Sequence, residues 1–200
     1  MKTFVFDADG VVCSGQNFGA ALEAKHDIPS ERLQPFFSGP FVECLLGRCD
    51  LKEVIAPYAN VWGWPRSVDD LLAFWFQAEH SICPAVLACV RKLRTNGHQC
   101  VLGTNQKAHR AAYLRREMGL AEEFDHLFVS CEMGVTKPSI DFFRQIESRL
   151  GLKPTQLCLI DDSEKNVLSA SSAGWHTILY RGTNDLGLIS DAADQVGALD

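Results

Sequence analysis

Several features that would assign this chain to a class are missing from its 200 residues. No apolar run approaches the ~20 residues that a membrane-spanning helix needs. The chain contains no run of five or more Lys or Arg residues, which would be typical of a nucleic-acid-binding arm. The net charge of −6 also argues against nucleic-acid binding. Only three apolar residues separate Thr3 from Asp7, so we expect no secretory signal and a cytoplasmic location.

The chain also lacks any CxxC pair, although it contains eight cysteines. Most of them lie inside apolar runs such as AVLACV and QLCLI, which favours reduced, buried thiols over disulfides. Cys44 and Cys49 have no ligand spacing with His26 or His80 that is typical of zinc sites, so zinc is not expected.

What the chain does contain is typical of a globular protein, with 46% hydrophobic and 22% charged residues. Its length suits one full domain, or a core domain that carries a smaller inserted one. The acidic balance does not exclude a small anionic substrate, because a bound cation can reverse the local field.

From residue 84 onward, segments with strand and helix patterns alternate. Four short apolar runs rich in β-branched or bulky residues are predicted as strands buried on both faces: 98–105, 126–130, 156–162 and 176–180. Between them lie four segments with helical periodicity that each end at a glycine, the favoured helix stop: 84–97, 106–119, 139–151 and 163–174. With a further strand at 3–7, this order predicts βαβ units and a parallel sheet.

Residues 14–82 interrupt the alternation. They contain no convincing strand but several helical segments, of which 68–80 is the best marked, with Ser67 and Asp70 spaced as a capping box. The predicted fold class is therefore α/β, with a Rossmann-like parallel sheet core of residues 1–13 and 83–200. A small helical cap domain of residues 14–82 is inserted into that core.

Polar residues follow the predicted strands at their carboxyl ends, where open parallel sheets bind ligands. They are Asp7 and Asp9, then Thr104 and Asn105, then Asp161 and Asp162, with Lys137 in a loop just before a helix. Two residues apart along an extended segment, Asp7 and Asp9 are expected to face the same crevice. We expect all seven side chains to converge there.

This set of groups suits phosphoryl transfer through a covalent intermediate. Asp7 would attack phosphorus, and Asp9 would protonate the leaving oxygen and later deprotonate water. Thr104, Asn105 and Lys137 would hold the phosphoryl oxygens and stabilise the developing charge. Oxygen ligands select a hard cation such as Mg²⁺, which takes one or two carboxylates together with a substrate phosphate.

The same residues form four motifs that resemble the haloacid dehalogenase superfamily of phosphohydrolases, in the same order and over nearly the whole chain. The motifs are DADGV (7–11), GTNQ (103–106), the lysine of VTKPS (135–139) and IDDSEKN (160–166). The insert after the first motif resembles the helical cap of a subgroup that includes sugar-phosphate phosphatases, β-phosphoglucomutase and the phosphatase domain of soluble epoxide hydrolase. The segment LGRCDLKEV (46–54) also resembles that subgroup.

The resemblance implies that Asp7 is the nucleophile and Asp9 the acid/base. It implies that Mg²⁺ is held by Asp7, the backbone carbonyl of Asp9, and Asp162, which aligns with the acid of the family's GDS variant. Asp161 is then either a second carboxylate near the metal or an outer partner of its ligands. Arg48 of the cap is either a contact for the distal part of an anionic substrate or a solvated surface residue.

These expectations favour a Mg²⁺-dependent phosphatase that hydrolyses a small phosphomonoester, such as a sugar phosphate or similar metabolite, without nucleic acid or membrane as a partner. A phosphomutase that keeps the same aspartates remains open. A dehalogenase is less favoured, because the resemblance implies that such enzymes have no acid at the position of Asp9. A non-catalytic phosphate-binding module is the alternative outside enzymes.

Overall fold

A single parallel sheet organises the molecule. The computed structural model describes residues 2–194, and within these residues five parallel strands pair in the order β3-β2-β1-β4-β5. The strands are β1 (Thr3–Phe6), β2 (Gln99–Thr104), β3 (His126–Val129), β4 (Leu157–Asp161) and β5 (His176–Leu179). This confirms the predicted α/β fold class with a Rossmann-like sheet.

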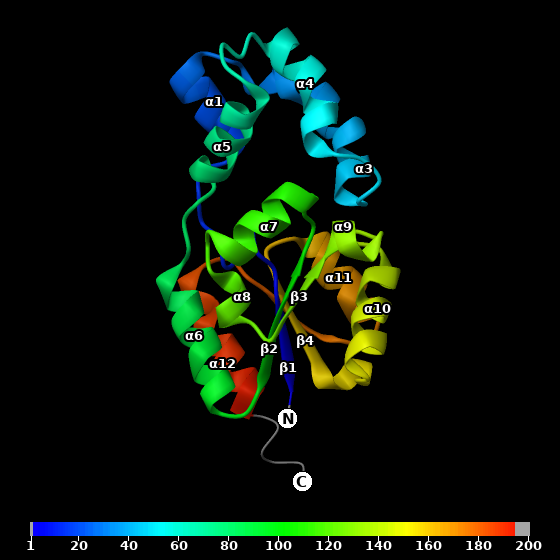
Figure 1. The fold of residues 1–200 in the computed structure, drawn as a ribbon. Coiled ribbons are helices and arrows are strands. Elements are labelled where there is room, and N and C mark those ends of the chain that lie inside the picture. The colour runs from blue at the N-terminus through cyan, green and yellow to red at the C-terminus, as the bar shows by residue number, and fades with distance from the viewer. Residues whose placement is uncertain (1, 195–200) are drawn as a thin grey trace.

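Strand alternation sends side chains to two separate hydrophobic clusters, one on each face of the sheet. Phe4 and Phe6 of β1 join the cluster formed with α6, α7, α8 and α12, whereas Val5 joins the cluster formed with α10 and α11. Figure 1 shows these helices on opposite sides of the sheet. The core is therefore a three-layer arrangement whose strands are directed toward the same end.

The helices of the core and their bounds are α6 (Pro84–Thr95), α7 (Ala108–Arg116), α8 (Leu120–Glu123), α9 (Ser130–Met133), α10 (Ile140–Leu150), α11 (Glu164–Ser172) and α12 (Leu186–Asp194), with short 3₁₀ turns η2 (Pro154–Gln156) and η3 (Thr183–Asp185). The sequence pattern did not predict α12, which buries Ile189 and Ala193 beside α6.

The strands at the two ends of the sheet are less buried than the sequence pattern predicted. His176 at the start of β5 is exposed and the other three residues of this strand are only half-buried, and β3 is buried only at its carboxyl end. Each of the two pairs with one neighbour, β5 with β4 and β3 with β2. The expectation of burial on both faces is therefore wrong for these edge strands and holds for β1 and β4.

Helices between residues 18 and 78, called the cap from here on, lie above the carboxyl ends of the strands (Figure 1). They are α1 (Phe18–His26), η1 (Ser30–Leu33), α2 (Gln34–Phe37), α3 (Pro40–Leu45), α4 (Leu51–Trp62) and α5 (Val68–Ala78). The capping box of Ser67 and Asp70 starts α5 as expected. The cap has its own hydrophobic cluster, which includes Phe18, Trp62 and Trp75.

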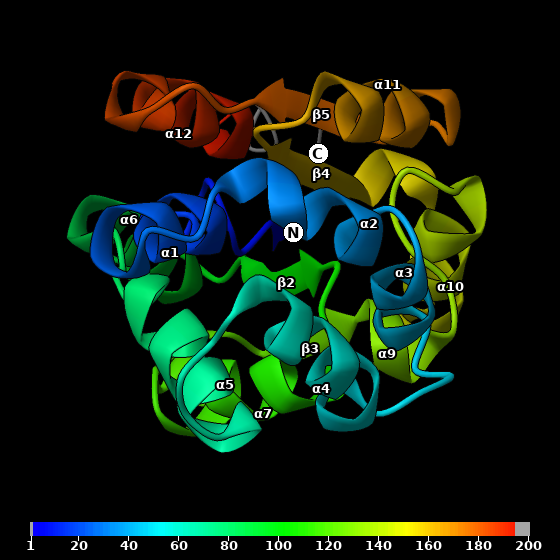
Figure 2. The same cartoon turned by 90° about the horizontal axis from the view of Figure 1, so that it is seen from above.

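Cap and core contact each other at two places: at α7 with its N-terminal approach, and at α9, which packs against α3. The Lys107 ammonium lies 4.0 Å from the ring centroid of Trp75, and His109 Nε2 lies 3.0 Å from Asp50 of the cap. Viewed from above, the cap helices α4 and α5 overlie α7, whereas β5, α11 and α12 lie to one side (Figure 2). The division into a core domain and a cap domain stays a prediction, and its last six residues, 195–200, lie outside the described residues.

Within residues 2–194, no helix has the length and apolar character needed to cross a membrane. All eight cysteines are free, and four of them are buried.

Candidate active site

Asp7 follows β1, the central strand at which the strand order changes direction, so it lies at the switch point of the sheet. Its backbone N–H donates to Ile160 O at 2.9 Å, which extends the pairing of β1 with β4 by one residue. Oδ1 accepts the N–H of Ala8 at 2.7 Å, and Oδ2 lies 2.9 Å from Lys137 Nζ. The carboxylate is thereby fixed, with one of its oxygens in contact with a cation.

Lys137 is held in place by Asn105. The Asn105 side chain accepts the Lys137 N–H at 2.8 Å and donates to the Lys137 carbonyl oxygen at 2.9 Å. One hydrogen of the Asn105 amide is left for another acceptor. Burial alone would lower the pKa of the Lys137 ammonium, but the carboxylates of Asp7 and Asp161 together raise it above its ordinary value.

The two acids after β4 have different surroundings. Asp161 is fully buried; its Oδ2 lies 2.6 Å from Lys137 Nζ, and its Oδ1 accepts from the Ser163 N–H and from Asn166 Nδ2, each at 2.9 Å. Asp162 is exposed instead. The Asp161 carboxylate is therefore engaged by Lys137, Ser163 and Asn166, whereas the Asp162 carboxylate is exposed and more available to a ligand.

The donor set fits a divalent cation. Asp7, Asp161 and Asp162 can bring one carboxylate oxygen each within 4.8 Å of one another, and Lys137 alone balances three negative charges incompletely. Burial raises the pKa of Asp7 to about 7 against the opposing Lys137 ammonium, and burial followed by the charge of Asp161 raises the pKa of Asp162. A bound cation would favour the ionised carboxylates, and Mg²⁺ prefers such oxygen ligands.

Gly10 shapes this site through its backbone. Its φ of +83° lies in the left-handed region, and a Cβ built on it would lie 2.1 Å from Asp162 Oδ2. A side chain at this position would therefore collide with the carboxylate that we expect to bind metal.

Asp9 does not share a face with Asp7 through strand alternation as expected, because the chain turns directly after Asp7. The turn is closed by hydrogen bonds from Gly10 N to Cys13 O at 2.9 Å and from Cys13 N to Ala8 O at 2.7 Å. Asp9 nevertheless stays near enough for its charge to contribute to the raised pKa of Asp7. Its side chain is 52% exposed and its Oδ2 accepts from Gln106 Nε2 at 2.6 Å.

The other predicted residues lie around these aspartates or outside them. Thr104 is buried at the end of β2, beside β1. Arg48 is exposed on the cap and forms an ion pair with Glu43 at 3.2 Å. This arrangement favours the interpretation of Arg48 as a solvated surface residue over a substrate contact.

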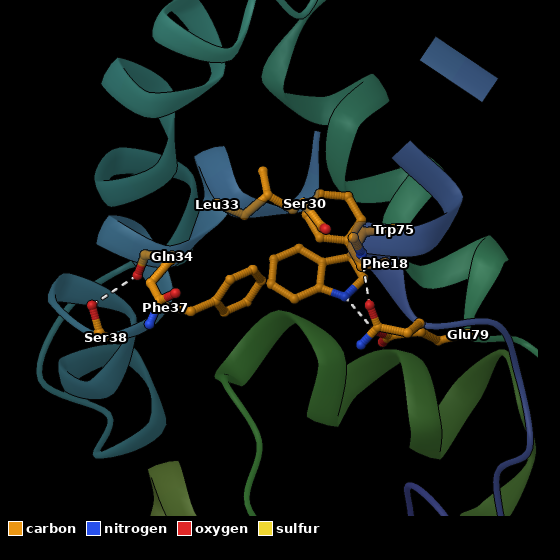
Figure 3. A pocket seen from close by; sticks show the side chains of 10 residues that line it. Phe18, Ser30, Leu33, Gln34, Phe37, Ser38, Trp75 and Glu79 are labelled. Atoms are coloured by element: carbon orange, nitrogen blue, oxygen red, sulfur yellow. Dashed lines mark hydrogen bonds between the residues drawn. The ribbon is translucent and has the colours of Figure 1, made fainter. Parts of the chain in front are cut away.

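A cavity of about 460 Å³ opens in the cap beside the core (Figure 3). Its walls combine aromatic Phe18, Phe37 and Trp75 with polar Ser30, Gln34 and Ser38. A smaller hollow of about 240 Å³ is lined by Asp9, Gly10, Cys13 and Gly15, and both spaces share Asn17 and Glu79 as walls. The cavity therefore adjoins the hollow that Asp9 lines.

Sequence reasoning missed Gln106, Lys107, Arg110, Glu79 and Asn166 as residues of this region. Arg110 left a signal, since it lies one position before Ala111 and four before Leu114 on the apolar face of its helix, where a charged residue is unusual. Glu79 left none, because its approach to Arg110 joins residues 31 positions apart in the chain.

Relatives of known sequence match different shares of the chain. Acyl-CoA dehydrogenase family member 10 of Mus musculus is 23% identical over 190 residues, which cover 88% of this chain and 18% of that protein. Bifunctional epoxide hydrolase 2 of Rattus norvegicus is 34% identical over 64 residues, which cover 32% of this chain and 12% of that protein. The chain thus spans at most 18% of the length of these curated relatives.

Solved structures show the same fold. A predicted HAD-like family hydrolase from Porphyromonas gingivalis superposes with a TM-score of 0.79 at 21% identity, over 96% of this chain and 97% of that chain. A HAD family enzyme from Bacteroides thetaiotaomicron, in complex with magnesium and inorganic phosphate, gives 0.76 at 22% identity, over 89% and 93%. L-2-haloacid dehalogenase from Xanthobacter autotrophicus, with chloropropionic acid covalently bound, gives 0.66 at 20%, over 88% and 76%.

The family model for haloacid dehalogenase-like hydrolases matches residues 1–174, which includes all four motifs. This match agrees with the parallel sheet and with the aspartates at its switch point. The chain belongs to the haloacid dehalogenase-like hydrolases.

Proposed function

We propose that this protein is a Mg²⁺-dependent phosphatase that hydrolyses a small phosphomonoester through an aspartyl-phosphate on Asp7. The observation that carries the proposal is the pairing of two aspartates with different surroundings. Asp7 is nearly buried and held by Lys137 at 2.9 Å, whereas Asp9 is half-exposed and borders the hollow that adjoins the cap cavity. The first arrangement suits a nucleophile and the second a proton donor.

In the first step the Asp7 carboxylate forms a bond to phosphorus while the bond from phosphorus to the leaving oxygen breaks. Asp9 gives its proton to that oxygen. In the second step Asp9 takes a proton from water, whose oxygen attacks the phosphoryl group and releases inorganic phosphate from Asp7. Lys137 and Thr104 would hold the phosphoryl oxygens, and Asn105 would keep the Lys137 loop in position.

Mg²⁺ bound by Asp7, the Asp9 carbonyl and Asp162, with Asp161 beside them, would neutralise charge between carboxylate and phosphate. The magnesium and phosphate found together in the similar enzyme from Bacteroides thetaiotaomicron support this choice of cation. The excess of carboxylates over Lys137 in this chain supports it independently.

The walls of the cap cavity support a small hydroxylated leaving group such as a sugar. Rings of Phe18 and Trp75 stack with centroids 4.3 Å apart and offer apolar surface, while Asn17, Ser30 and Gln34 offer hydrogen-bonding groups (Figure 3). The free state of all eight cysteines supports a cytoplasmic location.

Asp9 also distinguishes the phosphatase from the dehalogenase. A halide leaves without a proton, so a dehalogenase has no use for a second carboxylate placed to donate one. The solved dehalogenase shares the fold with this chain, and that likeness alone does not extend to the reaction.

The experiment is a panel of phosphorylated metabolites assayed for free phosphate, with Mg²⁺ and with EDTA. We expect release with Mg²⁺ and none with EDTA, and the ranking of esters identifies the substrate. Isomerised ester without free phosphate would indicate a mutase, and chloride released from 2-haloacids would indicate a dehalogenase. Binding of a phosphate analogue without turnover would indicate a binding module.

A further inference from the structure

Arg110 of α7 is a charged residue outside the four motifs and is 0% exposed. Its guanidinium donates to two backbone carbonyls at the end of cap helix α5, to Phe76 O at 3.3 Å and to Glu79 O at 3.1 Å. The same group faces two carboxylates, Glu79 Oε2 at 3.7 Å from Nε and Asp9 Oδ1 at 3.9 Å from Nη2. Arg110 therefore links the cap to the acid/base of the core.

The burial of the Arg110 guanidinium lowers the stability of the folded state. In the described part of the chain, Arg110 Nε and Glu79 Oε2 are both buried without a hydrogen-bond partner. Burying a guanidinium and a carboxylate that are incompletely satisfied disfavours folding, since each loses its hydration. An apolar side chain at position 110 would avoid that cost, so packing does not explain why an arginine lies here.

Gln106 holds the other oxygen of Asp9. Its Nε2 donates to Asp9 Oδ2 at 2.6 Å, and Gln106 itself is 2% exposed. Ser130 of the core holds the backbone of Gln106, since its Oγ accepts the Gln106 N–H at 2.9 Å and donates to the Gln106 carbonyl at 3.3 Å. The amide that holds Asp9 is thus supported by the core rather than by the cap.

We propose that Gln106 and Arg110 are positioning residues for Asp9, and that Arg110 makes this positioning depend on the cap. Gln106 fixes Oδ2 as a hydrogen-bond acceptor. Oδ1, which lies beyond hydrogen-bond distance of Arg110, is then the atom that carries the proton to the leaving oxygen, and the guanidinium faces the charge that remains. Because Arg110 also holds the end of α5, Asp9 is aligned when the cap lies against the core.

The role rests on the proposed phosphatase activity and can be separated from it by changing the leaving group. A p-nitrophenolate leaves without a proton, whereas an alkoxide needs one from Asp9. We expect Gln106→Leu and Arg110→Met to lower kcat/KM for an alkyl phosphate by about 100-fold. With p-nitrophenyl phosphate the loss in kcat/KM should stay within about threefold, because this ratio covers only the steps through departure of the leaving group. It excludes the later attack of water, in which Asp9 serves both esters alike.

Two further variants make the result specific. Arg110→Lys keeps a cation and should recover part of the rate on the alkyl ester. Arg115→Met is the matched control on the same helix, because Arg115 binds Glu132 at the surface with Nη2 2.7 Å from Oε2, and it should behave as wild type. Gln106→Leu removes no hydrogen bond to the cap carbonyls, so it tests the positioning of Asp9 even where Arg110→Met fails to fold.

An equal loss of kcat/KM on both esters in the Gln106 and Arg110 variants would overturn the positioning role, since a merely structural defect does not depend on the leaving group. No loss on the alkyl ester would overturn it as well. Absence of phosphate release from both esters in the Mg²⁺-loaded wild type would refute the proposed phosphatase, and with it this role.

Discussion

Lys137 and Asp161 form a buried ion pair, with Nζ 2.6 Å from Oδ2 and at most 1% of either side chain exposed. The same ammonium lies 2.9 Å from Asp7. Asp161 therefore orients the cation that contacts the proposed nucleophile, and its own remaining acceptor positions are filled by Ser163 and Asn166. The neighbouring Asp162 makes no comparable contribution to the buried network.

The two acids after β4 are predicted to respond differently to amide substitution. Asp161→Asn removes one of the two carboxylates that contact the buried Lys137 ammonium, leaves Asp7 as the other, and should lower the free energy of unfolding by about 3 kcal/mol. Asp162→Asn removes an exposed carboxylate beside like charges and should change that free energy by less than about 0.5 kcal/mol. Urea unfolding in EDTA measures both. An equal cost for the two variants would contradict the assignment of Asp161 to the ion pair.

Mg²⁺ binding should depend on the close approach of Gly10 to Asp162. A ligand that binds only the folded state raises its melting temperature, so Mg²⁺ should raise the Tm of the wild type. Gly10→Ala should abolish that rise, because its Cβ would lie 2.1 Å from Asp162 Oδ2.

Gly97→Ala is the matched control for this measurement. Gly97 has nearly the same φ, +82°, but nothing lies within 4 Å of its Cβ position. This variant should lose stability from backbone strain and still respond to Mg²⁺ as the wild type does. If both alanine variants kept the Mg²⁺-dependent rise in Tm, the metal site would lie elsewhere.

Lys107 predicts a pH dependence of stability. It is 4% exposed beneath the rings of Phe41, Trp75 and Phe76, and burial lowers its pKa to about 8. In the unfolded chain the pKa of a lysine is about 10.4, so between these two values the unfolded state binds more protons and the Lys107 contribution to stability rises with pH. Below pH 8 the penalty of the buried charge is present in full.

Comparing wild type with Lys107→Met isolates this effect. Between pH 8 and about 10 the difference in unfolding free energy should shift in favour of the wild type, by at most about 3 kcal/mol. Urea unfolding of both proteins at several pH values gives the difference. A difference that stayed constant, or moved in favour of the methionine variant, would contradict the burial of the ammonium.

Much of the core was predictable because its signals are local. Each strand lies within one residue of its predicted bounds at either end, since a short apolar run followed by polar residues marks a buried strand that ends at the sheet edge. For the same reason, the predicted site residues lie near the carboxyl ends of neighbouring strands. Lys137 contacts Asp7, Asp161 and Asn105, and Thr104 ends β2, which pairs with β1.

What the sequence did not predict depends on contacts between distant segments. The Gln106–Asp9 bond joins residues 97 positions apart, and Arg110 reaches Glu79 across 31. Gln106 ends the GTNQ motif and Arg110 lies on the apolar face of its helix, but neither signal identifies the distant partner. The short α3 lacks enough turns for a pattern to appear, and the turn after Asp7 depends on hydrogen bonds that no strand pattern shows.

The most direct test of the proposed mechanism is the rate of phosphate release by Asp7→Asn, measured with Mg²⁺ on the best ester of the panel. The amide is close in size to the carboxylate but cannot form the aspartyl-phosphate. We predict a loss of about 1,000-fold or more relative to the wild type, in a variant that still unfolds cooperatively. Release at the wild-type rate would contradict the assignment of Asp7 as the nucleophile and, with it, the proposed reaction.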